Sequence, residues 1–401
     1  MKKLTVALSA GLLFIGISIA MAQNKPVAFE TKGQLEQYVS KGLLTLKMGS
    51  QMDKTTFADY EKIERKIMTK DEFGYIEYIN SPTGMPLGPN AVAVDKNEDI
   101  YILDSINKRI VIFNEKGEYE ESIDIKMLDE NCQINSQENI DMSIDSRGYV
   151  YILCPYLPEG TCILKINKNG EVKQGYIDAS KIKKYAKSPE KNKKLLDDIE
   201  KRRDFYILPE NVDEIRETLF KDSEDNVYVL SGKGKYLNIS TETLEPKEQL
   251  PGDISSNLNN IYTREPMIIN KRKPEQIKEI LVKSLDGTIK NKIQFQIPSK
   301  YKNKRLELFD AKVIGEDMFG NKYITLALAE AQNKHNVSVP LIYKYSKNWA
   351  LLSIIEIENQ MQNQVWYHKP IVSRSGNIYK LVWDTNKISE GEKLIKWEIK
   401  K

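Results

Sequence analysis

Short apolar runs alternate with polar turns along most of the chain, and five of these patterns share one form. In each, a run of β-forming residues ends at Asp or Ser, a polar turn follows, and a second run carries Tyr six positions after that Asp or Ser. The segments are VDKNEDIYIL (94–103), IDSRGYVYIL (144–153), KDSEDNVYVL (221–230), EDMFGNKYIT (316–325) and VSRSGNIYKL (372–381). Apolar runs flanking a tight polar turn predict β-hairpins. Their recurrence at intervals of tens of residues predicts a repeat architecture.

A second strand–turn–strand pattern follows each Tyr, as in RIVIFNEKGEYEESIDI (109–125). The interval between Tyr228 and Tyr323 is 95 residues, nearly two ordinary intervals, and EILVKSLDGTIKNKIQF (279–295) supplies the outer strands of a further unit there. Six units of four short strands result over residues 67–401. Many strands are apolar at consecutive positions, which is typical where neighbouring sheets cover both faces. The chain therefore predicts an all-β fold, a six-bladed β-propeller with four-stranded antiparallel blades.

The ends of the predicted propeller need further elements. The last unit ends after a third strand (394–399), and we expect Phe73 to Ile79 to supply its fourth strand and close the ring. A capping box at Thr31 and a stop at Gly42 predict a helix within a helical N-terminal extension, residues 23–66. The members of a second amphipathic stretch in this extension are Phe57, Tyr60, Ile63 and Ile67.

An insertion explains the long interval between Tyr151 and Tyr228. Ser188-Pro189 is a typical helix start, and the predicted helix runs to about Arg203 within a helical insertion at about 180–205. Its lysines face solvent, or they dock on an acidic partner or a lipid head group.

Segment 88–117 resembles the NHL repeat. The match consists of Gly88-Pro89, the run Asp104-Ser105-x-Asn107-x-Arg109-Ile110, and Phe113 before the outer turn. It covers 30 residues, and the other units keep only the hairpin and the outer turn. The resemblance implies a six-bladed propeller of the TolB-like superfamily. Such propellers include peptide-amidating lyases, lactone hydrolases, streptogramin lyases and pure binding scaffolds, so the fold leaves the activity open.

The N-terminus has the pattern of a signal peptide, residues 1–22. Lys2 and Lys3 precede an apolar run that ends at Ala20-Met21-Ala22, an A-x-A cleavage site. An uncleaved anchor is the alternative, but the run is short for a membrane span. We expect a periplasmic or secreted protein with no transmembrane span in the mature chain. Loss of both lysines lowers the formal charge from +3 to +1, which argues against nucleic acid as a partner.

The chain has three cysteines, an odd number for an exported protein. Cys154 ends one predicted strand and Cys162 begins the next, so a disulfide across this hairpin is the candidate pairing. Cys132 would then remain as a buried thiol.

Candidate catalytic chemistry is sparse. The two histidines, His335 and His368, are too few for the His-based site of the resembled lyases. A carboxylate-bound calcium ion on the axis, as in lactonases of this shape, stays open because its ligands would leave no local motif. Asp95-x-Asn97-x-Asp99 imitates a calcium loop but lacks the Gly and Glu that such a loop requires, and predicts a hairpin turn. We therefore predict no catalytic residue, no metal ligand and no cofactor.

Candidate binding residues lie on predicted rim loops. They are Trp366, Tyr367, His368 and Lys369 on the connector before the last unit, Arg264, Asn107 and Arg109. Aromatic and polar side chains on such connectors suit recognition. The alternatives are that Trp366 packs between blades and that Arg109 forms an ion pair with Asp104.

The sequence favours a non-catalytic binding or scaffold protein that recognises a protein, peptide or glycan through its rim loops. One alternative is a metal-dependent propeller hydrolase or lyase with a divalent ion on the axis. Another is a structural component of a larger envelope complex, docked through the helices at 31–42 and 189–203.

Overall fold

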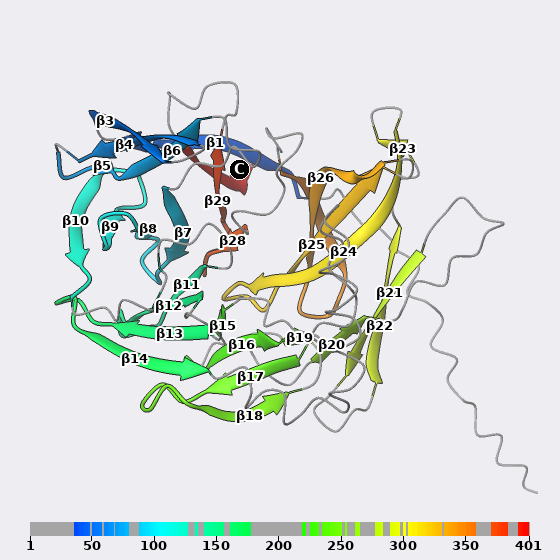
Figure 1. The fold of residues 1–401 in the computed structure, drawn as a ribbon. Coiled ribbons are helices and arrows are strands. Elements are labelled where there is room, and N and C mark those ends of the chain that lie inside the picture. The colour runs from blue at the N-terminus through cyan, green and yellow to red at the C-terminus, as the bar shows by residue number, and fades with distance from the viewer. Residues whose placement is uncertain are drawn as a thin grey trace, which may run out of the picture.

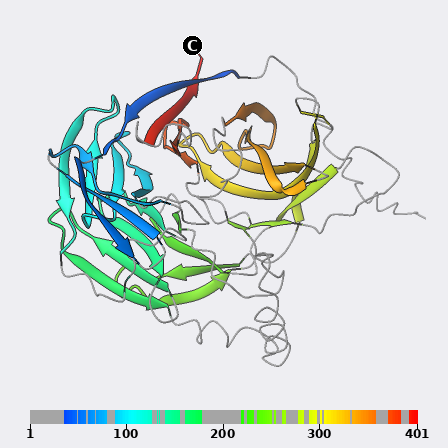
Figure 2. The ribbon, with the colours of Figure 1, turned by 45° about the horizontal axis from the view of Figure 1, so that its top comes forward.

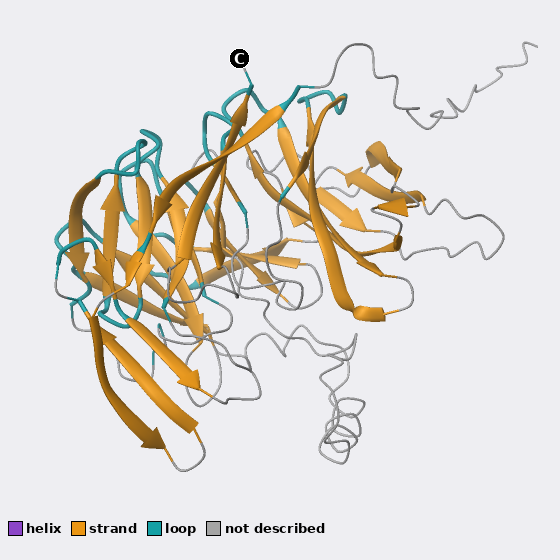
Figure 3. Cartoon of the chain, turned by 90° about the horizontal axis from the view of Figure 1, so that it is seen from above, coloured by secondary structure: helices purple, strands orange, loops and turns teal. Residues whose placement is uncertain are grey.

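The computed structural model describes the greater part of the chain. The described residues are 36–48, 50–57, 60–67, 69–79, 88–126, 132, 134, 140–155, 161–177, 219–221, 225–231, 235–250, 253–254, 261–264, 277–283, 289–296, 300–301, 304–330, 333–357, 370–383 and 392–400. Every regular element among them is a β-strand, and Figure 3 shows the strands with no helix. Within these ranges no helix is long and apolar enough to cross a membrane.

Four antiparallel sheets follow one another in chain order, each made of four consecutive strands. The first two consist of β7 (Pro89–Val94), β8 (Ile100–Asp104), β9 (Arg109–Phe113), β10 (Tyr119–Asp124), and β11 (Asp141–Ile144), β12 (Val150–Pro155), β13 (Thr161–Ile166), β14 (Val172–Ile177). The next two consist of β15 (Leu219–Lys221), β16 (Val227–Ser231), β17 (Lys235–Ile239), β18 (Pro246–Leu250), and β19 (Asp253–Ile254), β20 (Ile261–Arg264), β21 (Ile277–Lys283), β22 (Ile289–Gln296).

The remaining sheets complete the fold. A five-stranded sheet contains β23 (Lys300–Tyr301), β24 (Lys304–Glu316), β25 (Lys322–Glu330), β26 (Asn333–Tyr345) and β27 (Leu351–Glu356). The last four-stranded sheet combines β28 (Ile371–Val372), β29 (Ile378–Trp383) and β30 (Glu392–Ile399) with β1 (Tyr38–Thr45). Two small N-terminal sheets pair β2 (Lys47–Met48) with β5 (Glu72–Phe73), and β3 (Ser50–Phe57) with β4 (Tyr60–Lys66) and β6 (Tyr75–Ile79).

The large sheets surround a common axis, which makes the fold a β-propeller (Figure 1). Neighbouring sheets contact one another around this axis: β7 contacts β11, β11 contacts β15, β17 contacts β19, β19 contacts β24, β24 contacts β28, and β28 contacts β7. The apolar core lies between neighbouring sheets. One cluster joins Ile152 and Leu164 to Ala93 and Ile110, and another joins Tyr323 to Trp397. Consecutive apolar residues in a strand are therefore buried on opposite faces of the sheet, because neighbouring sheets cover both faces.

The ring is closed by a different strand from the one predicted. β1 pairs antiparallel with β30, from Tyr38 opposite Ile399 to Thr45 opposite Lys393, so the two ends of the chain share one sheet (Figure 2). The predicted donor, Phe73 to Ile79, instead forms β5 and β6, which pair with β2 and β4. Phe73 is buried and stacks on Phe113, with ring centroids 6.2 Å apart. These apolar residues cover the first sheet instead of extending the last one.

The predicted N-terminal helix is also wrong where the structure describes it. Residues 38–42 belong to β1. Of the second amphipathic stretch, Phe57 lies in β3, Tyr60 and Ile63 lie in β4, and Ile67 directly follows β4. Gly42, predicted as a helix stop, lies at a register shift in β1, which is a common place for glycine in a strand. Pairing with β30, far away in sequence, outweighs the local capping signal. Residues 1–22 and the insertion at about 180–205 lie outside the described residues.

Candidate functional site

The repeated hairpin turn is built around one side chain. In the turns β7–β8, β11–β12 and β24–β25, an Asp carboxylate accepts two backbone N–H groups, from the residues two and four positions later. The N···O distances are 2.7 and 2.9 Å at Asp95, 3.0 and 2.9 Å at Asp145, and 2.9 and 3.0 Å at Asp317. Asp caps a turn in this way because its short side chain reaches its own backbone. The motif that imitates a calcium loop at Asp95 is therefore a hairpin turn.

The recurring Tyr is tied to the same turn. The hydroxyl of Tyr151 donates to Asp145 Oδ2 at 3.3 Å, and the hydroxyl of Tyr323 donates to Asp317 Oδ2 at 3.0 Å. Both rings are fully buried, and burial together with the carboxylate raises the pKa of both phenols well above their usual value. The spacing of six residues thus joins each turn to the core.

Neighbouring turns are bonded to one another. Glu98 accepts hydrogen bonds from the Tyr379 hydroxyl at 2.8 Å and from Asn377 Nδ2 at 3.2 Å. The Met318 N–H donates to the Arg374 carbonyl at 2.8 Å, and Ser146 bonds to Asp225. These bonds link two groups of turns, 95–99 with 373–377 and 317–321, and 145–149 with 225–226; we call the five turns together the turn rim.

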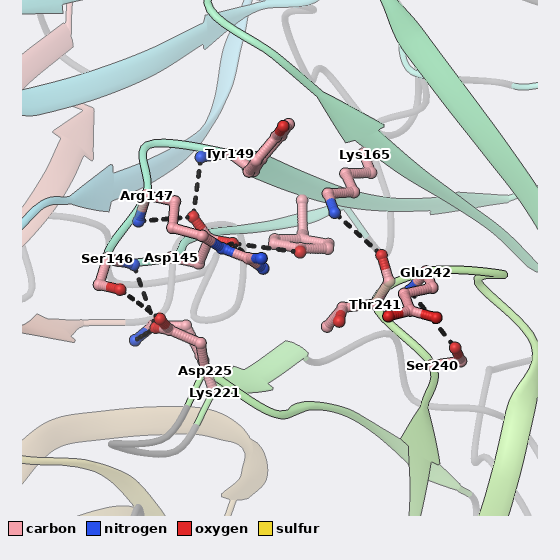
Figure 4. Close-up of polar contacts among 11 residues, drawn as sticks. Asp145, Ser146, Arg147, Tyr149, Lys165, Lys221, Asp225, Ser240, Thr241 and Glu242 are labelled. Atoms are coloured by element: carbon pink, nitrogen blue, oxygen red, sulfur yellow. Dashed lines mark hydrogen bonds and ion pairs between the residues drawn. The ribbon is translucent and has the colours of Figure 1, made fainter.

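Figure 4 shows the part of the turn rim where β11–β14 meets β15–β18. Lys221 Nζ lies 3.0 Å from Asp225 Oδ1. Burial would raise the pKa of Asp225, but hydrogen bonds from Ser146 and Lys221 outweigh it, so the pKa lies below its usual value. Lys165 Nζ donates to the Thr241 carbonyl at 2.9 Å and lies 4.2 Å from the Tyr149 ring centroid. These charges are engaged with groups of the chain itself, so this cluster fastens two sheets together.

The turn at 317–321 departs from this polar pattern. Met318 and Phe319 occupy its two outermost positions and are 60% and 64% exposed. The same positions of the other turns carry polar residues: Lys96-Asn97, Ser146-Arg147, Ser223-Glu224 and Arg374-Ser375. Two large apolar side chains therefore project from a turn whose backbone is fixed by the buried Asp317.

Two neighbouring turns place cations near this apolar pair, and the Glu98 carboxylate reaches one of them, where it accepts a hydrogen bond from the Ser375 N–H at 3.3 Å. The turn between β26 and β27 of the same sheet lies alongside. Lys347 of this turn is close to Gly320 and to Lys322, whose Nζ donates to the Gly320 carbonyl at 3.0 Å. The turn that contains Arg374 is also adjacent, because the Arg374 carbonyl accepts a hydrogen bond from the Met318 N–H. We call the exposed residues of these three turns the rim patch; they are Met318, Phe319, Lys347, Asn348, Arg374 and Ser375. None of these six residues is acidic.

The binding residues predicted from sequence are not part of this patch. Trp366, Tyr367, His368 and Lys369 lie outside the described residues, and Arg264 is in β20, where its side chain is not described.

Asn107 and Arg109 both bond to the buried carboxylate of Asp104. Arg109 Nε donates to it at 3.0 Å and Asn107 Nδ2 at 2.8 Å, while the rest of the guanidinium donates to the carbonyls of Lys70 and Glu72. Arg109 is buried, so the ion pair weighed from the sequence is the arrangement present. The NHL-like run thereby fastens the N-terminal segment to the first sheet.

The rim patch was missed by sequence reasoning, although a signal was present. Met318-Phe319 in EDMFGNKYIT are apolar, whereas the equivalent positions of the other four turns are polar. The lack of polar residues at these two turn positions is visible in the sequence itself.

The cysteines lie together in the second sheet. Cys154 and Cys162 are direct cross-strand partners, and Cys132 lies beside them; all three are thiols in the structure. Within the described ranges, they are the one group of His, Cys, Asp and Glu side chains spaced closely enough to share a metal ion.

Comparisons with known proteins assign no family. No family model matches, and no curated protein matches. Among solved structures, the chain is similar to the PQQ-bound aldose sugar dehydrogenase from Streptomyces coelicolor (8% identity, TM-score 0.42, 92% of this chain and 100% of that chain). It is also similar to virginiamycin B lyase from Staphylococcus aureus (10% identity, TM-score 0.34, 91% and 100%) and BamB from Moraxella catarrhalis (9%, 0.32, 90% and 100%). At these identities and TM-scores, the likenesses assign no function to this chain.

Proposed function

We propose that this protein is an exported, non-catalytic binding protein that recognises a protein partner through the rim patch. In this proposal the propeller is six-bladed and its first blade is of the NHL type. Five four-stranded sheets and one five-stranded sheet support the blade number, and the Asp104–Asn107–Arg109 cluster supports the NHL assignment. Export rests on the signal-peptide pattern of residues 1–22, and the periplasm or the extracellular space is the expected location.

The observation that carries the proposal is the exposure of Met318 and Phe319 at the tip of a rigid turn. Burial of one such side chain is worth roughly 1.5–3 kcal/mol, and this stabilisation is forgone in the isolated chain. Aromatic and Met side chains are enriched at the centres of protein interfaces. The turn backbone is already held by Asp317, so little backbone freedom would be lost when a partner binds.

The charge of the patch defines the partner. Lys347 and Arg374 are the charged residues of the rim patch, and the Glu98 carboxylate that reaches it is engaged with Ser375 and Asn377. A protein segment with apolar residues flanked by Asp or Glu would complement it in both respects. A glycan would use the apolar pair less well, since Met318 and Phe319 offer it no hydrogen-bonding group.

The first test selects peptides from a random displayed library on the wild-type protein. We expect enriched peptides to combine apolar and acidic residues and to lose at least about tenfold in affinity for M318S/F319S, which corresponds to about 1.4 kcal/mol. The matched control is I354S, because Ile354 is an exposed apolar residue on β27 outside the turn rim. Failure to enrich any peptide, or equal binding to M318S/F319S and wild type, would overturn the proposal.

The second test addresses the enzyme alternative. The protein is dialysed against metal-free buffer and its metal content is measured by elemental analysis. A divalent ion retained at one equivalent, and unaffected by removal of the cysteine thiols, would favour a carboxylate-bound metal on the axis and a hydrolase or lyase. A folded protein without such an ion would leave binding as the function.

A further inference from the structure

The three thiols form a compact cluster. One comes from the connector between β10 and β11, and two come from the β12–β13 hairpin of the second sheet. Cys132 lies between β10 and β11, Cys154 in β12 and Cys162 in β13. Their sulfur atoms all lie within 4.8 Å of one another. Cys132 Sγ and Cys154 Sγ lie 3.3 Å apart, and Cys154 Sγ lies 3.8 Å from the Cys162 carbonyl oxygen. The Cys154 thiol therefore contacts both of the other cysteines.

The environment of the cluster is apolar. All three cysteines are buried within the core cluster that contains Leu103, Ile134 and Met142. Hydrogen bonds with Cys132 and Cys162, followed by burial, raise the pKa of the Cys154 thiol. A carbonyl oxygen close to Cys154 Sγ also suits an S–H donor and disfavours a thiolate.

Three neighbouring thiols can bind a metal ion or form a disulfide, and the apolar environment favours the disulfide. Three thiolates around a soft metal ion of charge +1 or +2 would leave a net negative charge in the core, which is costly without a compensating cation. A disulfide is neutral and suits an apolar site. The Cys132 and Cys154 sulfurs need to approach by only slightly more than 1 Å to reach the usual S–S bond of about 2.05 Å.

We propose that Cys132 and Cys154 form a disulfide in the exported protein and that Cys162 remains a thiol beside it. The two thiols lose two protons and two electrons as the S–S bond forms. A disulfide oxidant, such as a thiol–disulfide oxidoreductase or oxidised glutathione, accepts both and leaves as two thiols. The pairing differs from the Cys154–Cys162 candidate: those residues are already held together by strand pairing, whereas Cys132 lies on a connector.

The bond would fix the connector at one end of the propeller. The Asn90 amide at the start of β7 donates to the Ile134 carbonyl at 3.0 Å, two residues after Cys132. The turn rim follows the other end of β7, at residues 95–99. A Cys132–Cys154 disulfide would therefore hold the connector over the end of the ring opposite the turn rim, independently of the binding proposed there.

The test maps the bond in the protein expressed with its own N-terminal segment and incubated with oxidised glutathione. Remaining thiols are alkylated under denaturing conditions, the chain is digested, and the peptides are identified by mass spectrometry. We expect a peptide linking Cys132 to Cys154, alkylated Cys162, and a melting temperature at least about 3 °C higher than in the reduced protein.

Two variants keep the test decisive. C162A should retain the linked peptide and the melting-temperature difference between oxidised and reduced protein, whereas C132A should lose both. Three alkylated cysteines after oxidation, or a predominant Cys154–Cys162 link in the wild type, would overturn the proposal. So would one equivalent of zinc or copper(I) that protects the thiols from alkylation, because the cluster would then be a metal site.

Discussion

At the scale of single residues, the backbone at the fourth position of each hairpin turn is in the left-handed region. Substituting two of the glycines found there would measure the cost of backbone strain and the cost of steric crowding separately. Gly148 and Gly376 have φ values of 84° and 87°. A Cβ at Gly148 would meet nothing within 4 Å, whereas one at Gly376 would lie 2.6 Å from the Tyr323 hydroxyl and 3.0 Å from Asp317 Oδ2. We expect G148A to lower the free energy of unfolding by about 1 kcal/mol and G376A by about 2–4 kcal/mol, as measured by urea denaturation. Equal losses would show that the close packing at Gly376 contributes nothing.

Lys380 allows a prediction of pH dependence at the same scale. Burial in β29 lowers the pKa of Lys380 to about 8, below its usual value of 10.5. Between these values the unfolded chain binds the proton and the folded chain does not, so this residue destabilises the fold fully below pH 8 and its cost is relieved as the pH rises. K380M should therefore raise the free energy of unfolding by about 1–3 kcal/mol at pH 7 and reduce its rise between pH 8 and 10. The control is K96M at an exposed position; identical pH profiles of wild type and K380M would contradict the assignment.

At the scale of elements, the local hairpins follow from the sequence and the long-range pairings do not. Asp145 to Tyr151 specifies a turn, a strand and a buried hydroxyl contact within seven residues, so a repeated spacing was sufficient to predict it. β1 has no such signal, because its partner β30 lies more than 340 residues away and its alternating exposure is weak. The capping box at Thr31 and the glycine at position 42 indicated a helix, since local signals are the only ones that a single segment carries.

Closure by β1 predicts that the two chain ends unfold together. Leu46, directly after β1, is 1% exposed, donates its N–H to the Glu392 carbonyl at 2.7 Å and packs in the same cluster as Leu394. We expect L46A to lower the free energy of unfolding by about 2–4 kcal/mol, and V39A, at an exposed position of β1, by less than about 1 kcal/mol. Hydrogen exchange in L46A should accelerate in β1 and β30 alike. Acceleration confined to β1 would show that the pairing does not couple the ends.

At the scale of the whole molecule, repetition makes the rim patch recognisable. Each turn is compared with its equivalents in the same chain, so Met318-Phe319 is conspicuous without any relative to compare. The predicted connector site at Trp366 to Lys369 used residue type and position on a connector, and it had no equivalent in the other units for comparison. Which turns become neighbours, however, depends on the ring: Arg374 reaches Met318 only because β28 contacts β24. The sequence could thus reveal the apolar pair but not its cationic surroundings.

The ring therefore predicts where charge should matter for binding. K347E/R374E reverses both cations beside Met318 and Phe319, while K96E/K116E makes the same change in net charge on turns of the first sheet. For peptides selected on the wild type, we expect K347E/R374E to weaken binding at least about tenfold and K96E/K116E to change it less than about twofold. Isothermal titration at two salt concentrations measures this, and wild-type affinity should fall at the higher one because salt screens the cations. Equal losses in the two double variants would mean that net charge, and not the rim patch, attracts the peptides. The patch as a specific site would then be excluded even if Phe319 contributed to affinity.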